Sequence, residues 1–291
     1  MTHSSSIPQP DWTAHTVVTV DPDTKPRYYE RYDVRPVYAA LLDACAHLGI
    51  EVCVLRQEHS PLNIWVRDWG FAANAYFTYA PPYDGPYEPA AIQKARARLS
   101  ELTGCSPRPV PLIFDGGNLV HNGSVAIVTD RVLDHNRRVS KGKGEAEFIK
   151  LGFERVVFVP AEPGDQIGHA DGILRFSSPN VLLVNDYKGA EFRDYGRKLR
   201  ACLAEAHLGC EIVPFPWFYE KRRHDGVDSA KGYYINFVLT AQGAICPAFE
   251  DDRDDEAAAL LEKHTGLPVR SVMATPLARW GGVLNCVTLT L

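Results

Sequence analysis

The chain has 291 residues, of which 45% are hydrophobic and 23% are charged, a balance that allows a substantial hydrophobic core. Its formal net charge of -5 argues against a nucleic-acid-binding protein, because such proteins usually carry a clustered excess of Lys and Arg. The first residues lack the basic and apolar pattern of a secretion signal, and no run approaches the ~20 apolar residues of a membrane span. We therefore expect a cytoplasmic protein that binds neither nucleic acid nor a membrane.

Short β-branched or apolar runs alternate with amphipathic stretches along the chain, which predicts an α/β fold. The predicted strands cover residues 16–20, 51–55, 71–78, 110–114, 125–129, 155–159, 173–176, 181–184, 211–215, 234–239, 244–248, 268–272 and 284–291. The predicted helices cover residues 35–48, 89–103, 144–151, 192–208 and 254–265. No Ser/Gly linker or charge run divides the sequence, so we expect residues 1–291 to form one domain.

Five short polar segments each follow a predicted strand. Their sequences are IWVRDWG (64–70), FDGGN (114–118), IGHADG (167–172), GYYINF (232–237) and WGGVLNC (280–286). Their spacing of roughly 50 to 70 residues indicates five copies of one β/α unit, and in a ring of such units all five would point at one central pocket. Two long loops, 78–89 and 219–232, are candidate lids over that pocket.

The chain has seven cysteines, an odd number, with no Cys-x-x-Cys pair and no Cys/His cluster at metal-ligand spacing. This pattern predicts neither a disulfide framework nor a metal site. A free cysteine is usually a small buried hydrophobe. Cys286 differs from that expectation because Gly281 and Gly282 allow a ligand to approach the backbone, and because the polar Asn285 stands beside the sulfur.

His169 and Asp171 are the second candidates. In an extended segment, residues two apart face the same side, so these side chains would project together. A turn aspartate beside a solvated histidine explains the same pattern equally well.

Asp68 and Asp115 are further candidate acids. Asp68 lies between Trp65 and Trp69, which would surround its charge with apolar wall, although an Arg67–Asp68 surface ion pair is the ordinary alternative. Asp115 opens a Gly-Gly turn and is also compatible with a simple turn residue.

A thiol, an imidazole and an orienting carboxylate together make a nucleophilic site. Here there are more carboxylates than such a site needs, and extra negative charge disfavours a thiolate unless a cation balances it. A guanidinium fits, because it is planar and presents paired N–H donors to carboxylates.

The motifs resemble those of the agmatine deiminases and the Porphyromonas-type peptidylarginine deiminases, which are guanidine-modifying enzymes of the pentein fold. The resemblance runs from about residue 64 to the end of the chain through WVRDWG, FDGGN, GHADGILRF, YYINFVLTAQGAICPAF and GGVLNC. It implies a five-bladed, pseudo-fivefold α/β propeller and a deiminase that needs no cofactor. The substrate would be a small guanidino cation, agmatine-like or arginine-like, and a homodimer is an assembly that the sequence leaves open.

The resemblance also implies residue roles. Cys286 matches the nucleophile, His169 the general acid/base and Asp115 the acid that supports the histidine, while Asp68 and Asp171 match the two guanidinium-binding acids. The predicted substrate-binding set is completed by Asn236, Trp65, Arg67, Asn118 and Gly282. Asp115 stands where the family usually has Glu, so we expect its contact with His169 to be longer or bridged by water.

Three alternatives remain. The first is an amidinotransferase, in which an amine takes the place of water, and the second is a binding protein of the same fold without activity. A Cys-His-Asp protease or a transglutaminase is a weaker third, since neither needs the surplus carboxylates.

Overall fold

The computed structural model describes residues 8–56, 63–79, 89–165 and 167–291. The α/β prediction agrees with the observed elements. Their helices are α1 (Arg27–Glu30), α2 (Arg35–Leu48), α3 (Val66–Trp69), α4 (Pro89–Thr103), α5 (Arg131–His135), α6 (Lys141–Ile149), α7 (Arg193–Glu205), α8 (Asp254–Thr265) and α9 (Thr275–Ala278). Within the described ranges no helix is long and apolar enough to cross a membrane.

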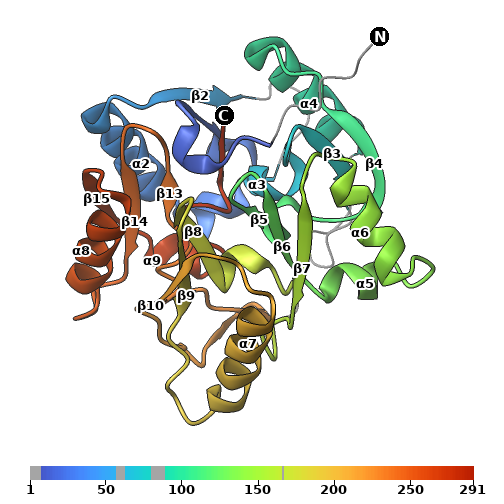
Figure 1. Cartoon of the computed structure of the whole chain (residues 1–291). Helices are drawn as coiled ribbons and strands as arrows, with labels where there is room; N and C mark the ends of the chain where they lie inside the picture. Colours follow the sequence, from blue (N-terminus) through green and yellow to red (C-terminus); the bar gives the residue numbers. More distant parts are fainter. Residues whose placement is uncertain (1–7, 57–62, 80–88, 166) are drawn as a thin grey trace.

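The strands form small separate sheets, which follow one another around the middle of the molecule (Figure 1). Four sheets have three strands: β16-β1-β2 (Thr288–Thr290, Thr16–Val20, Glu51–Leu55), β5-β6-β7 (Val120–His121, Val125–Thr129, Arg155–Val159), β8-β9-β10 (Leu174–Ser178, Val181–Asn185, Glu211–Phe215) and β13-β14-β15 (Val238–Leu239, Ala244–Ala248, Val269–Met273). The other two are β3-β4 (Ala75–Thr78, Arg108–Ile113) and the hairpin β11-β12 (Arg223–His224, Val227–Asp228).

One pattern is common to the three-stranded sheets. In each, the middle strand pairs antiparallel with one neighbour and parallel with the other. The parallel pairs are connected through helices, namely α2, α5 with α6, α7 and α8, and α4 likewise connects the parallel strands β3 and β4. Figure 1 shows α2, α4, α6, α7 and α8 on the outside of the molecule, so the inner ends of the sheets face one another.

The first sheet joins the two ends of the described chain. Val17 of β1 pairs with Val52 in parallel and with Thr290 in antiparallel orientation. The backbone N–H of Thr16 also donates to the carbonyl of Leu291 at 2.9 Å. The β16 strand therefore supplies to the first sheet the antiparallel partner that the other three-stranded sheets take from the strand just before their middle strand.

Apolar spacing explains the outer helices and the buried strands. In α7 the residues Tyr195, Leu199 and Leu203 recur every four positions and are buried, so they form one face against the β8-β9-β10 sheet. In β6 all five residues are buried, which is the pattern of a strand covered on both faces.

Several predicted strands are shorter than expected. The predicted strand at 234–239 is irregular up to Phe237 and a strand only over β13. The predicted strand at 284–291 is a turn through Val287 and a strand only over β16. The predicted strand at 71–78 begins at Ala75. In the first two segments apolar residues are buried by packing inside the molecule and not by strand pairing, which is why their composition resembles that of a strand.

Candidate active site

One cavity, of about 340 Å³, collects side chains from all five polar segments. Its inner lining includes Asp68, Asp115, His169, Asp171, Asn236 and Cys286. Trp65 and Trp280 belong to its wall, and so do Tyr219 and Tyr233. Of the two candidate lids, residues 219–232 contain the β11-β12 hairpin and contribute Tyr219, Asp225, Val227, Asp228, Ser229 and Ala230 to the wall. Most of the other candidate lid, residues 80–88, lies outside the described residues.

Cys286 is partly buried and lies in the turn that precedes β16. Asn236 holds this turn, because its side-chain oxygen accepts a hydrogen bond from the Cys286 backbone N–H at 3.3 Å. The same oxygen lies 3.3 Å from the sulfur, which is an acceptable distance for an S–H donor. The Asn285 backbone N–H also donates to the Asn236 carbonyl at 3.1 Å. Asn236 therefore fixes the position of the thiol from two directions.

His169 lies between two carboxylates. Its Nε2 atom is 3.2 Å from Oδ2 of Asp115, and its Nδ1 atom is 3.6 Å from Oδ1 of Asp68. The shorter Asp115 side chain thus reaches the imidazole directly, where we expected a longer or water-bridged contact. His169 is in extended conformation, but Ala170 to Gly172 form a 3-10 helix, so the two-residue alternation expected for His169 and Asp171 is wrong. Both side chains nevertheless line the cavity.

Asp171 is buried and is held through two different groups. Its Oδ2 atom accepts a hydrogen bond of 2.6 Å from the side-chain amide of Asn285. Its backbone carbonyl accepts one of 3.3 Å from the amide of Asn236. Asn285, which precedes Cys286, thus holds the carboxylate of Asp171, and Asn236, which bonds Cys286, holds its backbone.

The Gly-Gly pairs are needed because other groups approach their backbone closely. A Cβ atom on Gly117 would lie 2.7 Å from Nδ1 of His169 and 2.8 Å from Oδ1 of Asp68. A Cβ atom on Gly282 would lie 2.5 Å from the indole ring of Trp65. Both distances are shorter than van der Waals contact, so only glycine allows these segments to meet.

Two of the predicted substrate-binding residues do not line this cavity. The backbone N–H of Arg67 donates to the Cys286 carbonyl at 3.3 Å, but its guanidinium points to the other side of Asn285. The side-chain oxygen of Asn118 accepts from the backbone N–H groups of Thr129 and Ala170, at 2.9 and 3.2 Å. Both residues hold site segments together. Trp65 and Gly282 do line the cavity, whereas Trp69 belongs to the core.

The charges of the site shift its pKa values strongly. Burial alone would lower the pKa of His169, but Asp68 and Asp115, with Asp171, raise it to about 10. Burial, with Asp171 and Asp68, raises the pKa of Cys286 well above its usual value near 9. Burial and the other carboxylates raise the pKa of Asp68 to about 7 even though His169 opposes them. At neutral pH these shifts favour a neutral thiol at Cys286 and an imidazolium at His169 in the same cavity.

This arrangement is suited to a planar cation. A guanidinium placed between Asp68 and Asp171 would offset the negative charge that keeps the thiol protonated. The same placement would bring its central carbon toward the sulfur, with His169 within reach of a leaving amine.

Sequence analysis missed two groups in this region. Asn285 was noted only as a polar neighbour of the sulfur, although it is the residue that anchors Asp171. Glu162 lines the outer cavity, where it accepts hydrogen bonds from the hydroxyls of Tyr187, at 2.5 Å, and Tyr233. Its segment, PAEPGD, reads as an ordinary loop, and no signal in the sequence separates it from one.

The chain is similar in sequence and in fold to known proteins. The Porphyromonas-type peptidyl-arginine deiminase family profile matches residues 31–291. An agmatine deiminase from Pseudomonas aeruginosa is 25% identical over 254 residues, which cover 76% of this chain and 67% of that protein. The structure of the agmatine deiminase of Enterococcus faecalis superposes with a TM-score of 0.77 at 17% identity, covering 98% of this chain and 94% of that one. A C. jejuni agmatine deiminase carrying a C315S substitution and a bound substrate superposes with a TM-score of 0.74 at 18% identity, covering 97% and 95%.

Proposed function

Because this chain belongs to the family of Porphyromonas-type peptidyl-arginine deiminases, we propose that Cys286 is the nucleophile with which it hydrolyses a guanidino group. The chain is a guanidine-modifying hydrolase, and its products are a ureido compound and ammonia. The observation that carries the residue assignment is the single cavity in which the thiol, the imidazole of His169 and the carboxylates of Asp68 and Asp171 meet.

The first step is attack on the guanidinium carbon. Asp68 and Asp171 receive the N–H groups of the substrate, and the arriving positive charge lowers the pKa of Cys286, so that its thiol releases a proton to solvent and becomes a thiolate. The C–S bond forms, and His169 gives its proton to the departing nitrogen as the C–N bond breaks. Ammonia leaves, and an S-alkylthiouronium remains on the cysteine.

Water completes the reaction in the second step. The neutral His169 removes a proton from water, and the resulting hydroxide attacks the thiouronium carbon. The C–S bond then breaks while the hydroxyl proton passes to the departing sulfur, which gives the ureido product and restores the thiol. Asp115 supports this exchange, because its contact with Nε2 of His169 orients the ring and stabilises the imidazolium. Arg67 and Asn118 act as positioning residues, in keeping with their contacts outside the cavity.

The part of the active-site cavity that Glu162, Asp225 and Asp228 line favours a substrate whose far end is an amine. Among the described residues, Asp225 and Asp228 are paired with Arg31 and Arg223, whereas Glu162 accepts hydrogen bonds from two tyrosine hydroxyls and forms no ion pair. Burial raises the pKa of Glu162 to about 7, so its negative charge develops near neutrality. An agmatine-like amine would gain from this charge, whereas the carboxylate of an arginine-like substrate would be repelled by it.

We also propose that residues 1–291 form one domain in which five units surround a pseudo-fivefold axis. Support comes from the shared strand order of the three-stranded sheets and from the five polar segments, which occupy equivalent places between successive units.

The test is a panel of guanidino compounds assayed for ammonia and for ureido product, with Cys286→Ala and Cys286→Ser beside the parent. We expect both variants to lose turnover by about 10⁴-fold or more while they still bind substrate. Cys202→Ala is the matched control, because its thiol lies on α7, and it should retain activity. Normal ammonia release from either Cys286 variant would overturn the assignment.

Two additions to the panel test the finer points. Amine-ended compounds should give a lower KM than compounds with a carboxylate. Candidate acceptor amines should not divert the ureido product into a guanidino product, which is what an amidinotransferase would do.

A further inference from the structure

A second cavity, of about 840 Å³, lies on the other side of Asp171. Asp11, Arg67, Arg175, Asn285 and Thr290 belong to its lining, and Asp171 lines both cavities. Asp171 therefore lies between the two cavities, and charged groups in the second cavity can affect a cation bound in the active site by acting on this carboxylate.

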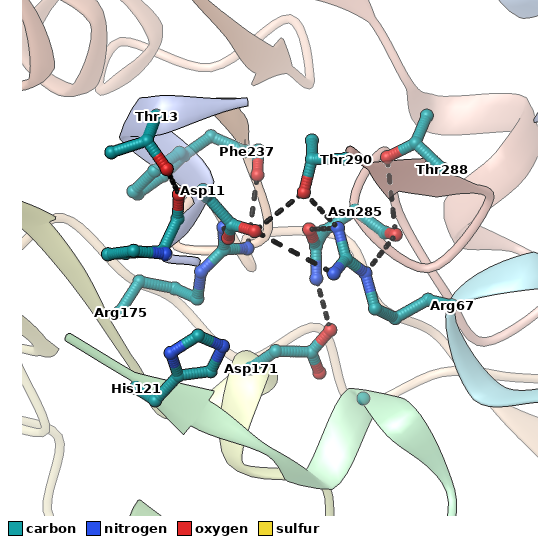
Figure 2. Close-up of polar contacts among 12 residues, drawn as sticks. Asp11, Thr13, Arg67, His121, Asp171, Arg175, Phe237, Asn285, Thr288 and Thr290 are labelled. Carbon is teal, nitrogen blue, oxygen red and sulfur yellow. Dashed lines mark hydrogen bonds and ion pairs between the residues drawn. The ribbon is translucent and has the colours of Figure 1, made fainter. Parts of the chain in front are cut away.

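Two arginines and one carboxylate form a cluster in this region (Figure 2), in which Arg175 is buried and Arg67 and Asp11 are partly buried. Arg175 is 3% exposed, donates to the Phe237 carbonyl at 3.2 Å and forms an ion pair with Asp11. Nη1 of Arg67 lies 3.8 Å from Oδ1 of Asp11. The hydroxyl of Thr290 donates to that same oxygen at 2.6 Å. Asp11 thus faces both guanidinium groups at once.

Asn285 connects this cluster to the active site. Nη2 of Arg67 donates a hydrogen bond to Oδ1 of Asn285 at 2.9 Å. Nδ2 of the same Asn285 donates one to Oδ2 of Asp171 at 2.6 Å. Figure 2 shows Asn285 between Arg67 and Asp171. Oδ2 of Asp171 is consequently bonded to Asn285, which leaves Oδ1 for the substrate.

The charges of the cluster balance only because Asp11 is present. Arg67 and Arg175 bring two positive charges, and Asp11 and Asp171 are the carboxylates that act on Arg175. Burial raises the pKa of Asp11, but Arg175 and Arg67 outweigh it and lower the value to about 2, so Asp11 is ionised. His121 adds no positive charge, because burial, against the attraction of Asp11, lowers its pKa to about 4.

We propose that Asp11 is a positioning residue, the internal counter-ion that satisfies Arg67 and Arg175 and so leaves the charge of Asp171 available to the guanidinium of the substrate. This inference rests on the proposed function. Asp11 lies in a short 3-10 helix (Asp11–Thr13) that precedes the region matched by the family profile, and it reaches Arg175 from 164 residues away in the sequence. Without it, the charges of Arg67 and Arg175 would compete with the substrate for the carboxylate of Asp171.

The test compares charge-changing variants, each with kcat and KM for the best substrate of the panel and with the Kd of that substrate in a Cys286→Ala background. Asp11→Asn should raise KM and Kd roughly tenfold and change kcat little. Arg175→Gln should have the opposite sign and lower Kd about twofold, because it leaves Asp11 in excess. The double variant Asp11→Asn/Arg175→Gln restores the charge balance and should return Kd to within about threefold of the parent.

A purely structural role predicts a different result. The double variant would then bind substrate no better than the worse single variant, and Arg175→Gln would raise Kd. Either of these two outcomes would overturn the proposal. Asp254→Asn is the matched control, because the Asp254 carboxylate, like that of Asp11, accepts a hydrogen bond from a side-chain hydroxyl, here of Tyr234, but lies outside both cavities. It should lower the thermal midpoint and leave Kd unchanged.

Two further results separate the possible failures. If Asp11→Asn does not fold, the sign of the Arg175→Gln effect decides alone. If the parent turns over no guanidino compound, the proposed function fails. If the parent is active but the substitutions at Asp11 and Arg175 leave Kd unchanged, only the proposed role of Asp11 is contradicted.

Discussion

At the scale of single residues, Asp68 has two opposing effects in the cavity. It is placed to receive a guanidinium, and its charge also contributes to the raised pKa of Cys286. Asp68→Asn should therefore lose guanidine turnover and, at the same time, lower the pKa of the thiol. More thiolate at a given pH means faster alkylation by a neutral reagent.

This prediction is checked with iodoacetamide over a range of pH, following the peptide that contains Cys286 by mass spectrometry. In the parent, alkylation should be slow at neutral pH and rise only above pH 9, whereas in Asp68→Asn the rise should begin at lower pH. The other cysteine peptides report on general accessibility and should behave alike in both proteins. An unchanged or upward shift in the Cys286 profile would contradict the electrostatic account.

Some residues of the site could be identified from the sequence, and others could not. Cys286, His169 and Asp68 could be selected because unusual neighbours, such as Gly-Gly pairs or a tryptophan, mark their segments. Asp11, Arg175 and Glu162 carry no such mark. Their importance depends on partners far away in the sequence, and no local pattern encodes those partners.

At the scale of elements, β16 connects the active site to the fold. It begins two residues after Cys286 and completes the first sheet beside β1. Its Leu289 is 2% exposed and packs in the cluster that also contains Val18, Trp69 and Phe71. The strand therefore fixes the turn that carries the thiol.

Leu289→Ala should lower the free energy of unfolding by about 2–5 kcal/mol, because it removes buried methyl groups and leaves a cavity. Urea unfolding measures this loss. Leu102→Ala, at a residue that is 46% exposed, is the control and should change stability by less than about 0.5 kcal/mol. A loss below about 1 kcal/mol for Leu289→Ala would mean that β16 is not packed as described.

Most of the long helices and several strands could be predicted. The bounds of α2, α4, α8, β1, β2 and β6 agree with the apolar periodicity of their sequences. The turns at residues 234–237 and 284–287 were predicted as strands, because an apolar residue buried in a turn looks the same in sequence as one buried in a sheet.

At the scale of the whole molecule, negative charge acts on a cationic substrate at longer range than any direct contact does. The formal net charge is -5, and carboxylates line both the inner and the outer parts of the cavity. A cation should therefore be attracted before it makes contact, and salt should weaken this attraction because the Debye length is only ~10 Å at 0.1 M.

Raising the ionic strength from about 0.02 to 0.5 M should lower kcat/KM for a guanidino cation by roughly threefold or more. Steady-state kinetics at fixed pH measure the effect. The control is the rate at which neutral iodoacetamide alkylates Cys286, which should change little. A salt-independent kcat/KM would show that the charge of the cavity does not attract the substrate.

The sequence by itself determined the repeated β/α order, the five polar segments and the chemical types of the groups in them, because these depend on local periodicity and composition. Only the tertiary structure decided which of those groups share a cavity. It turned Arg67 and Asn118 away from the cavity and brought Asp11 to Arg175. The physical reason is that a buried charge is placed by its counter-ions, and those counter-ions come from segments that meet only when the chain has folded.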